Sequence, residues 1–91
     1  MCSFLFGRPK YIWFVGKLPS GKIIMQGPYL TEKEERQDRK RMKYDKNYVC
    51  WKDRIKNELK LKGVTTIKEI ELFAKTPAGF RDEITRTGIQ I

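Results

Sequence analysis

Histidine is absent from this chain of 91 residues, and cysteine occurs only twice, at Cys2 and Cys50. Histidine is the commonest metal ligand among side chains, and a structural zinc site needs four nitrogen or sulfur ligands. We therefore expect neither a metal site nor a disulfide framework. Cys50 lies in an aromatic, β-branched segment, where a free cysteine usually serves as a small buried hydrophobe rather than as a reactive thiol.

Motifs of catalysis are missing as well. The chain contains no G-x-S-x-G, no phosphate-binding Walker loop and no H-E-x-x-H. Its acidic cluster, Glu32, Glu34 and Glu35, suits the first turn of a helix, where carboxylates interact favourably with the helix dipole. We therefore expect a protein that is not an enzyme and that uses no cofactor.

Long apolar runs are also lacking, since the longest uninterrupted one extends from Tyr11 to Val15. A transmembrane helix needs roughly 20 apolar residues. The N-terminal MCSFLFGRPK has neither the basic region nor the long apolar region of a signal peptide. We expect a cytoplasmic protein with reduced thiols and no membrane insertion.

Positive charge is what the sequence has in excess. It contains 20 Lys or Arg against 11 Asp or Glu, a formal net charge of +9. The excess is concentrated in residues 36–62, whereas residues 63–91 carry equal numbers of acids and bases. Such a field attracts nucleic acid, an anionic membrane surface or an acidic protein. With a hydrophobic fraction of 40%, the chain is expected to fold rather than to remain disordered.

The apolar pattern predicts a single α+β domain over residues 1–91, with a small antiparallel sheet at its N-terminal end. Residues 11–15 and 22–26 flank a Pro-Ser-Gly turn and predict a β-hairpin. The first of these strands is apolar throughout, which indicates a central strand covered on both faces. Residues 2–6 and 47–51 have the composition of two further strands.

A polar helix is expected to pack on this sheet and to complete the first part of the domain, residues 1–51. Thr31 and Glu34 form a capping box, which predicts a helix that begins at Glu32. Glu32 and Arg36, like Glu35 and Arg39, have the spacing of intrahelical ion pairs.

Three short helices are expected to follow in a helical subregion, residues 52–91. The first begins near Asp53 and ends at Gly63, where Val64 is placed to contact Leu59 in a Schellman motif. The second is predicted over residues 66–75 from a capping box. The third opens with a threonine cap and a proline at residues 76–77 and runs to about Arg86, with Gly88 and Ile89 as its stop.

Basic residues recur at helical spacing in residues 36–46 and 52–60, so that each set can line one helix face. Like charges at this spacing repel one another, and bound phosphates would relieve the repulsion. A face that is merely solvated is the alternative. The candidate nucleic-acid-binding residues on these helices are Arg36, Arg39, Lys40, Lys43, Lys46, Lys52, Lys56 and Lys60.

The segment WFVGKLPSGKIIMQGPYLTEKEE, residues 13–35, resembles AP2-type and integrase arm-type DNA-binding domains. In those families a three-stranded sheet backed by a helix lays its strands in the major groove. The resemblance implies that Trp13, Lys17 and Lys22 face DNA from the hairpin. The chain departs from the pattern at Glu35 and Asp38, where those families usually have alanines.

The segment LKLKGVTTIKEIELFAKTPAGFRDEITRTGI, residues 59–89, is similar to helix-hairpin-helix modules, in which backbone amides of the hairpins hold DNA phosphates. The resemblance implies hairpins at residues 63–65 and 88–89. Neither position has the G-x-G pair of that family.

We therefore expect a small basic domain that binds DNA or RNA without catalysis, mainly through phosphate contacts and with strong salt dependence. The alternative is a protein-interaction module, such as a virus-encoded accessory or inhibitor protein, that presents its basic helix to an acidic partner surface. Attachment to an anionic membrane surface is a weaker alternative, because residues 32–46 lack the apolar face that it requires.

Overall fold

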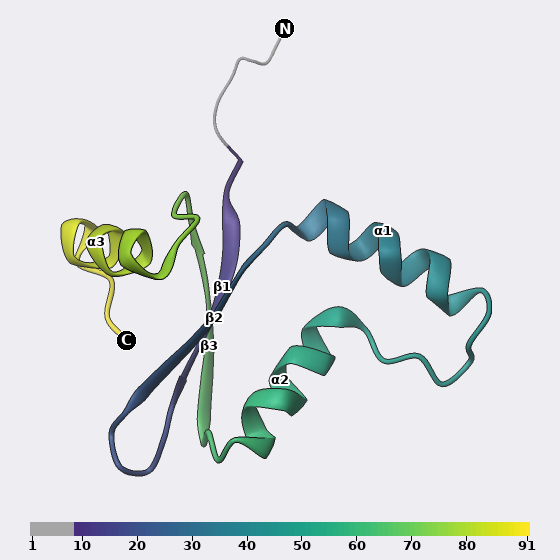
Figure 1. Cartoon of the computed structure of the whole chain (residues 1–91), viewed down its shortest axis with the longest axis horizontal. Coiled ribbons are helices and arrows are strands. Elements are labelled where there is room, and N and C mark those ends of the chain that lie inside the picture. The colour runs from purple at the N-terminus through teal and green to yellow at the C-terminus, as the bar shows by residue number, and fades with distance from the viewer. Residues whose placement is uncertain (1–8) are drawn as a thin grey trace, which may run out of the picture.

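A three-stranded antiparallel sheet forms the centre of the structure, a computed structural model that describes residues 9–91 (Figure 1). The strands are ordered β2-β1-β3, with bounds β1 (Tyr11–Lys17), β2 (Ile23–Tyr29) and β3 (Thr66–Leu72). The α+β class and the hairpin are thus confirmed, and the all-apolar strand is indeed the central one. The strand expected at residues 2–6 lies outside the described residues.

Helices cover both faces of the sheet. The chain passes from β2 through α1 (Thr31–Met42) and α2 (Trp51–Leu61) to β3, and then to α3 (Pro77–Thr87). Figure 1 shows α2 on one side of the strands and α3 on the other. Because side chains alternate along a strand, β1 supplies both cores. The α2-side core contains Ile12, Phe14, Trp51, Ile55, Leu59 and Val64. The α3-side core contains Trp13, Val15, Ile70, Leu72, Ala74 and Phe80.

The expectation of three C-terminal helices is wrong, because the segment expected as the second one contains strand β3. Its isoleucines at 67 and 70 fit a helical period, but β1 is buried on both faces and has a second edge to pair. Tyr11 lies opposite Leu72, and Lys17 opposite Thr66. Tertiary pairing therefore overrides the local helix signal, and residues 52–91 contribute to the sheet instead of forming a separate helical subregion.

The strand expected over residues 47–51 is also wrong. Cys50 is the N-cap of α2 and Trp51 is its first residue, so this segment ends a loop and opens a helix. The ring of Trp51 packs edge-on against Phe14, with centroids 5.8 Å apart. The aromatic residue that suggested a strand is therefore the one that anchors α2 to the sheet.

The helix ends were predicted with mixed success. Gly63 adopts a φ of +95°, and the Val64 amide donates to the Leu59 carbonyl at 3.1 Å, as a Schellman motif requires. The Thr76 hydroxyl caps α3 by accepting from the Gly79 amide at 3.0 Å. The capping box at Thr31 is wrong, because α1 begins one residue earlier than expected and has no side-chain cap.

Candidate functional site

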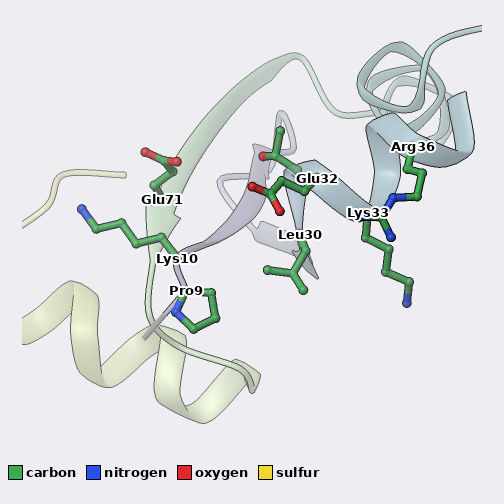
Figure 2. Close-up of a pocket in the computed structure, with 8 residues that line it drawn as sticks. Pro9, Lys10, Leu30, Glu32, Lys33, Arg36 and Glu71 are labelled. Atoms are coloured by element: carbon green, nitrogen blue, oxygen red, sulfur yellow. The ribbon is translucent and has the colours of Figure 1, made fainter. Parts of the chain in front are cut away.

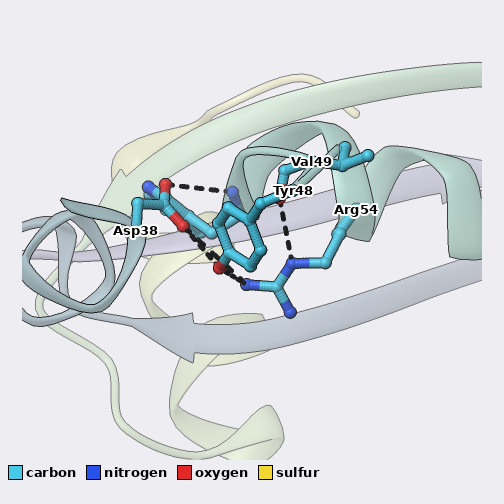
Figure 3. A network of polar contacts seen from close by, with 5 residues as sticks. Asp38, Tyr48, Val49 and Arg54 are labelled. Carbon is cyan, nitrogen blue, oxygen red and sulfur yellow. Dashed lines mark hydrogen bonds and ion pairs between the residues drawn. The ribbon is translucent and has the colours of Figure 1, made fainter. Parts of the chain in front are cut away.

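Helix α1 is held in place by one buried carboxylate rather than by an apolar stripe (Figure 3). Asp38 is only 7% exposed. Its Oδ1 accepts a hydrogen bond from the Tyr48 hydroxyl at 2.7 Å, and its Oδ2 accepts one from the Trp51 amide at 3.1 Å. The second bond satisfies a free amide at the start of α2. The polar helix therefore docks on α2, and the expectation that it packs on the sheet is wrong.

Arg54 extends this network. Its Nη2 donates to the Tyr48 hydroxyl at 2.9 Å and lies 4.0 Å from Asp38 Oδ1, while its Nε donates to the Val49 carbonyl at 3.3 Å. The hydrogen bond to Asp38 and burial raise the pKa of Tyr48, although the positive charge of Arg54 opposes the shift. The loop between α1 and α2 is thereby tied to both helices.

The side of α1 opposite Asp38 is uniformly basic. Four exposed residues at three- and four-residue steps share this side, over a rise of about 15 Å. Lys43, the C-cap, still has helical backbone angles, so it continues the row. We term this row the outer face of α1; it consists of Lys33, Arg36, Lys40 and Lys43. Of the other predicted residues, Arg39 is exposed next to Lys40 in α1, and Lys46 is exposed in the loop that follows the helix.

Lys33 was missed by the sequence-based selection, although a signal for it exists. It lies three residues before Arg36 and seven before Lys40, so it shares their side of the helix. Once Asp38 is recognised as the inward-facing residue, the outward positions follow from the helical period alone.

The outer face of α1 forms no ion pair with any residue between 9 and 91. All the ion pairs between residues 9 and 91 involve basic residues of α2 rather than of α1. The two intrahelical pairs expected from spacing, Glu32 with Arg36 and Glu35 with Arg39, do not form in this part of the chain. The outer face therefore presents its charge to solvent.

A hollow of about 500 Å³ lies where α1 leaves the sheet (Figure 2). Glu71 and Lys10 line one side, and Lys33 and Arg36 the other, with Glu32 between them. Charges of both signs line it, so it is not a simple anion pocket. The acids also weaken the positive field at the N-terminal end of α1, which leaves the C-terminal end the more basic.

Two of the predicted lysines on α2 point toward the sheet. Lys52 and Lys56 contact Glu69 of β3, with Nζ to carboxylate distances of 3.1 and 3.2 Å. Burial favours a higher pKa for Glu69, but the hydrogen bonds and charges of the two lysines prevail, and the pKa lies below its ordinary value. These lysines thus fasten α2 to β3 and are separate from the outer face of α1; Lys60, nearer the end of α2, is exposed.

The expected role of Trp13 at a DNA interface is wrong. Its side chain is 1% exposed, its ring lies 4.9 Å from that of Phe80, and its Nε1 donates to the Ala74 carbonyl at 3.0 Å. The AP2-type resemblance implies that one face of the sheet enters the major groove. In this structure α2 covers one face of the sheet and α3 covers the other. Lys17 and Lys22 are exposed at the hairpin end, apart from α1 (Figure 1).

The hairpins implied by the helix-hairpin-helix resemblance have their amides occupied within the chain. The Thr65 amide donates to the Lys17 carbonyl at 3.1 Å, and the amides of Gly88 and Ile89 donate to the Ile84 carbonyl. The helix that should connect the hairpins is replaced by β3. These amides are therefore not available to phosphates.

The described part of the chain contains no cluster of three or more acidic or cysteine residues placed to hold a metal ion. None of the helices in residues 9–91 has the length and apolar character needed to span a bilayer. Comparison of the chain with protein-family models, curated proteins and solved structures gives no match.

Proposed function

We propose that this chain is a non-catalytic, cytoplasmic nucleic-acid-binding domain whose phosphate-binding surface is the outer face of α1. The observation that carries the proposal is that the hydrogen bonds of Asp38 determine which side of α1 faces solvent. One buried carboxylate fixes the inner side of the helix, and four basic residues with no ion pair among the described residues occupy the opposite side. Arg39 and Lys46 extend the same surface.

A row of fixed positive charges suits a phosphate backbone for a physical reason. Each neutralised phosphate releases condensed counterions, and this release dominates non-specific affinity at moderate salt. The C-terminal end of a helix also favours cations, so helix stability alone accounts for part of the charge near Lys43. It does not account for Lys33 and Arg36, which lie in the N-terminal half of α1.

Fluorescence anisotropy tests the proposal. Labelled single-stranded DNA, single-stranded RNA and duplex DNA, each about 20 nucleotides long, are titrated at about 50 and about 200 mM salt. We expect binding that weakens steeply with salt. If no nucleic acid binds even at the lower salt, the proposal fails.

A matched pair of triple variants locates the surface. Replacing Arg36, Lys40 and Lys43 with Gln should make the salt slope shallower by about 2 to 3, roughly 0.7–0.9 for each lost phosphate contact. The control variant has Gln in place of three exposed basic residues on or beside α3, on the other side of the sheet: Lys75, Arg81 and Arg86. Equal weakening by both variants would show that net charge, not α1, governs binding.

The protein-interaction alternative is an outcome of the same design. If wild-type protein retains a partner from nuclease-treated lysate and the α1 triple variant loses it, while neither binds nucleic acid, the outer face of α1 serves an acidic protein surface instead.

A further inference from the structure

Tyr44 is the exposed aromatic residue at the basic end of α1. Its side chain is 90% exposed, more than any other large hydrophobic residue in the described part of the chain. The side chain forms no hydrogen bond and no ring contact with any residue between 9 and 91. The ring is thus available on both faces.

The other tyrosines are engaged. Tyr29 lies 5.7 Å from the ring of Trp51, Tyr11 packs against the α3-side core, and Tyr48 is bonded to Asp38. Among the tyrosines of the described residues, Tyr44 is the one whose side chain takes part in neither a core nor a hydrogen bond.

The backbone that carries Tyr44 is fixed. The amides of Tyr44 and Asp45 both donate to the Arg41 carbonyl, at 3.0 and 2.9 Å, which prolongs the last turn of α1. Further along the loop, the Tyr48 amide donates to the Asp45 carbonyl at 3.2 Å. The ring is therefore presented from an ordered backbone, and binding would cost little backbone entropy.

Tyr44 also continues the outer face of α1. It comes four residues after Lys40, so it lies on the same side of the helix, about 6 Å further along the axis. Lys43 directly precedes it, and Lys46 follows two residues later, after Asp45. An aromatic ring beside a row of basic side chains is the combination that binds unpaired nucleobases together with their phosphates.

Resting on the proposed function, we propose that the ligand is a single-stranded nucleic acid, with one unpaired base stacked on Tyr44 and its phosphates along the outer face of α1. A duplex keeps its base faces covered by neighbouring pairs, so the same ring meets no free base face there. The phosphate row alone would not discriminate between the two forms.

The test compares Tyr44→Ala and Tyr44→Phe with wild type, using a thymine 20-mer, a uracil 20-mer and an abasic strand of equal length. We expect Tyr44→Ala to weaken binding of the base-containing strands by about tenfold or more, which corresponds to about 1.4 kcal/mol, and that of the abasic strand by less than twofold. Tyr44→Phe keeps the ring face and should retain wild-type affinity. The DNA and RNA arms show which of the two strands is preferred.

Failure of this inference is distinct from failure of the proposed function. If Tyr44→Ala binds the thymine and uracil strands as wild type does, while the α1 triple variant is weakened, the stacking role is wrong and the phosphate surface stands. A preference of wild type for duplex would also overturn it. If no strand binds to wild type, both proposals fall. Unchanged circular dichroism of the variants verifies that they are folded.

Discussion

Asp38 solves, with one side chain, the problem of attaching a helix that has almost no apolar residues. A buried carboxylate is costly unless hydrogen bonds replace its lost hydration. Here the Tyr48 hydroxyl and the Trp51 amide supply those bonds, and the Arg54 guanidinium lies close by. The same bonds fix which side of α1 faces outward.

We expect Asp38→Ala to lower the free energy of unfolding by about 2 kcal/mol, because it leaves a hydroxyl and a helix-end amide without their acceptor. Urea unfolding followed by circular dichroism measures the change. Glu35→Ala, an exposed carboxylate of the same helix, is the control, with an expected change below about 0.5 kcal/mol. Equal effects of the two substitutions would contradict the anchoring role of Asp38.

Because the pKa of Glu69 is lowered in the folded state, the stability of the protein should depend on pH in the acidic range. The carboxyl binds protons less readily in the folded state than in the unfolded state, whose ordinary value is 4.5. As the pH falls below that value, protons therefore favour unfolding. We expect the melting temperature of wild type to fall between about pH 5 and about pH 3, and that of Glu69→Gln to fall less. If the melting temperatures of wild type and Glu69→Gln fall equally over this pH range, Glu69 makes no contribution.

At the scale of elements, β3 enters the sheet through a close contact between Gly16 and Val64. A Cβ on Gly16 would lie 2.5 Å from Val64 Cγ1, and both residues are buried. The glycine is needed here because it leaves room for the side chain of Val64, which lies between the end of α2 and the start of β3.

We expect Gly16→Ala to destabilise the protein by about 1–3 kcal/mol through overpacking. Val64→Ala should recover part of that loss in the Gly16→Ala background, although alone it destabilises by removing buried methyl groups. The coupling energy from a double-mutant cycle, measured by urea unfolding, should therefore be about 0.5 kcal/mol or more in the compensating direction. Strictly additive effects would show that the two sites do not touch.

The elements that could be predicted are those specified by nearby residues. The hairpin follows from an apolar run beside a glycine turn, and α3 from its Thr76 cap and the proline after it. The identity of β3 depends on the free edge of β1, some fifty positions earlier in the chain, so local periodicity suggested a helix. Asp38 was also missed, because its hydrogen-bond partners Tyr48 and Trp51 lie in residues 47–51, whose strand-like composition concealed a loop and a helix start.

The candidate site was predictable to a similar extent. The exposed charge of Arg36, Lys40 and Lys43 follows from the helical period. The burial of Trp13 and the engagement of Lys52 by Glu69 do not, because both depend on which elements cover the sheet.

At the scale of the whole molecule, the central strand β1 joins the two cores, because Ile12 and Phe14 lie in one and Trp13 and Val15 in the other. Trp13 reports on the α3-side core and Trp51 on the α2-side core. We expect Trp13→Phe and Trp51→Phe each to unfold in one transition, with tryptophan fluorescence and far-ultraviolet circular dichroism giving the same midpoint within each variant. Separate midpoints would show that the two cores unfold independently.

The position of β1 between β2 and β3 also has a consequence for synthesis. Its second edge partner begins at Thr66, and the helix that covers Trp13 begins at Pro77. At about 5–20 residues per second, the ribosome takes roughly 3–12 seconds to proceed from the end of β1 to the start of α3. For that interval the nascent hairpin has an open strand edge and an uncovered aromatic face. The newborn chain, more than the finished protein, is therefore the form at greatest risk of aggregation and the one that a chaperone would recognise.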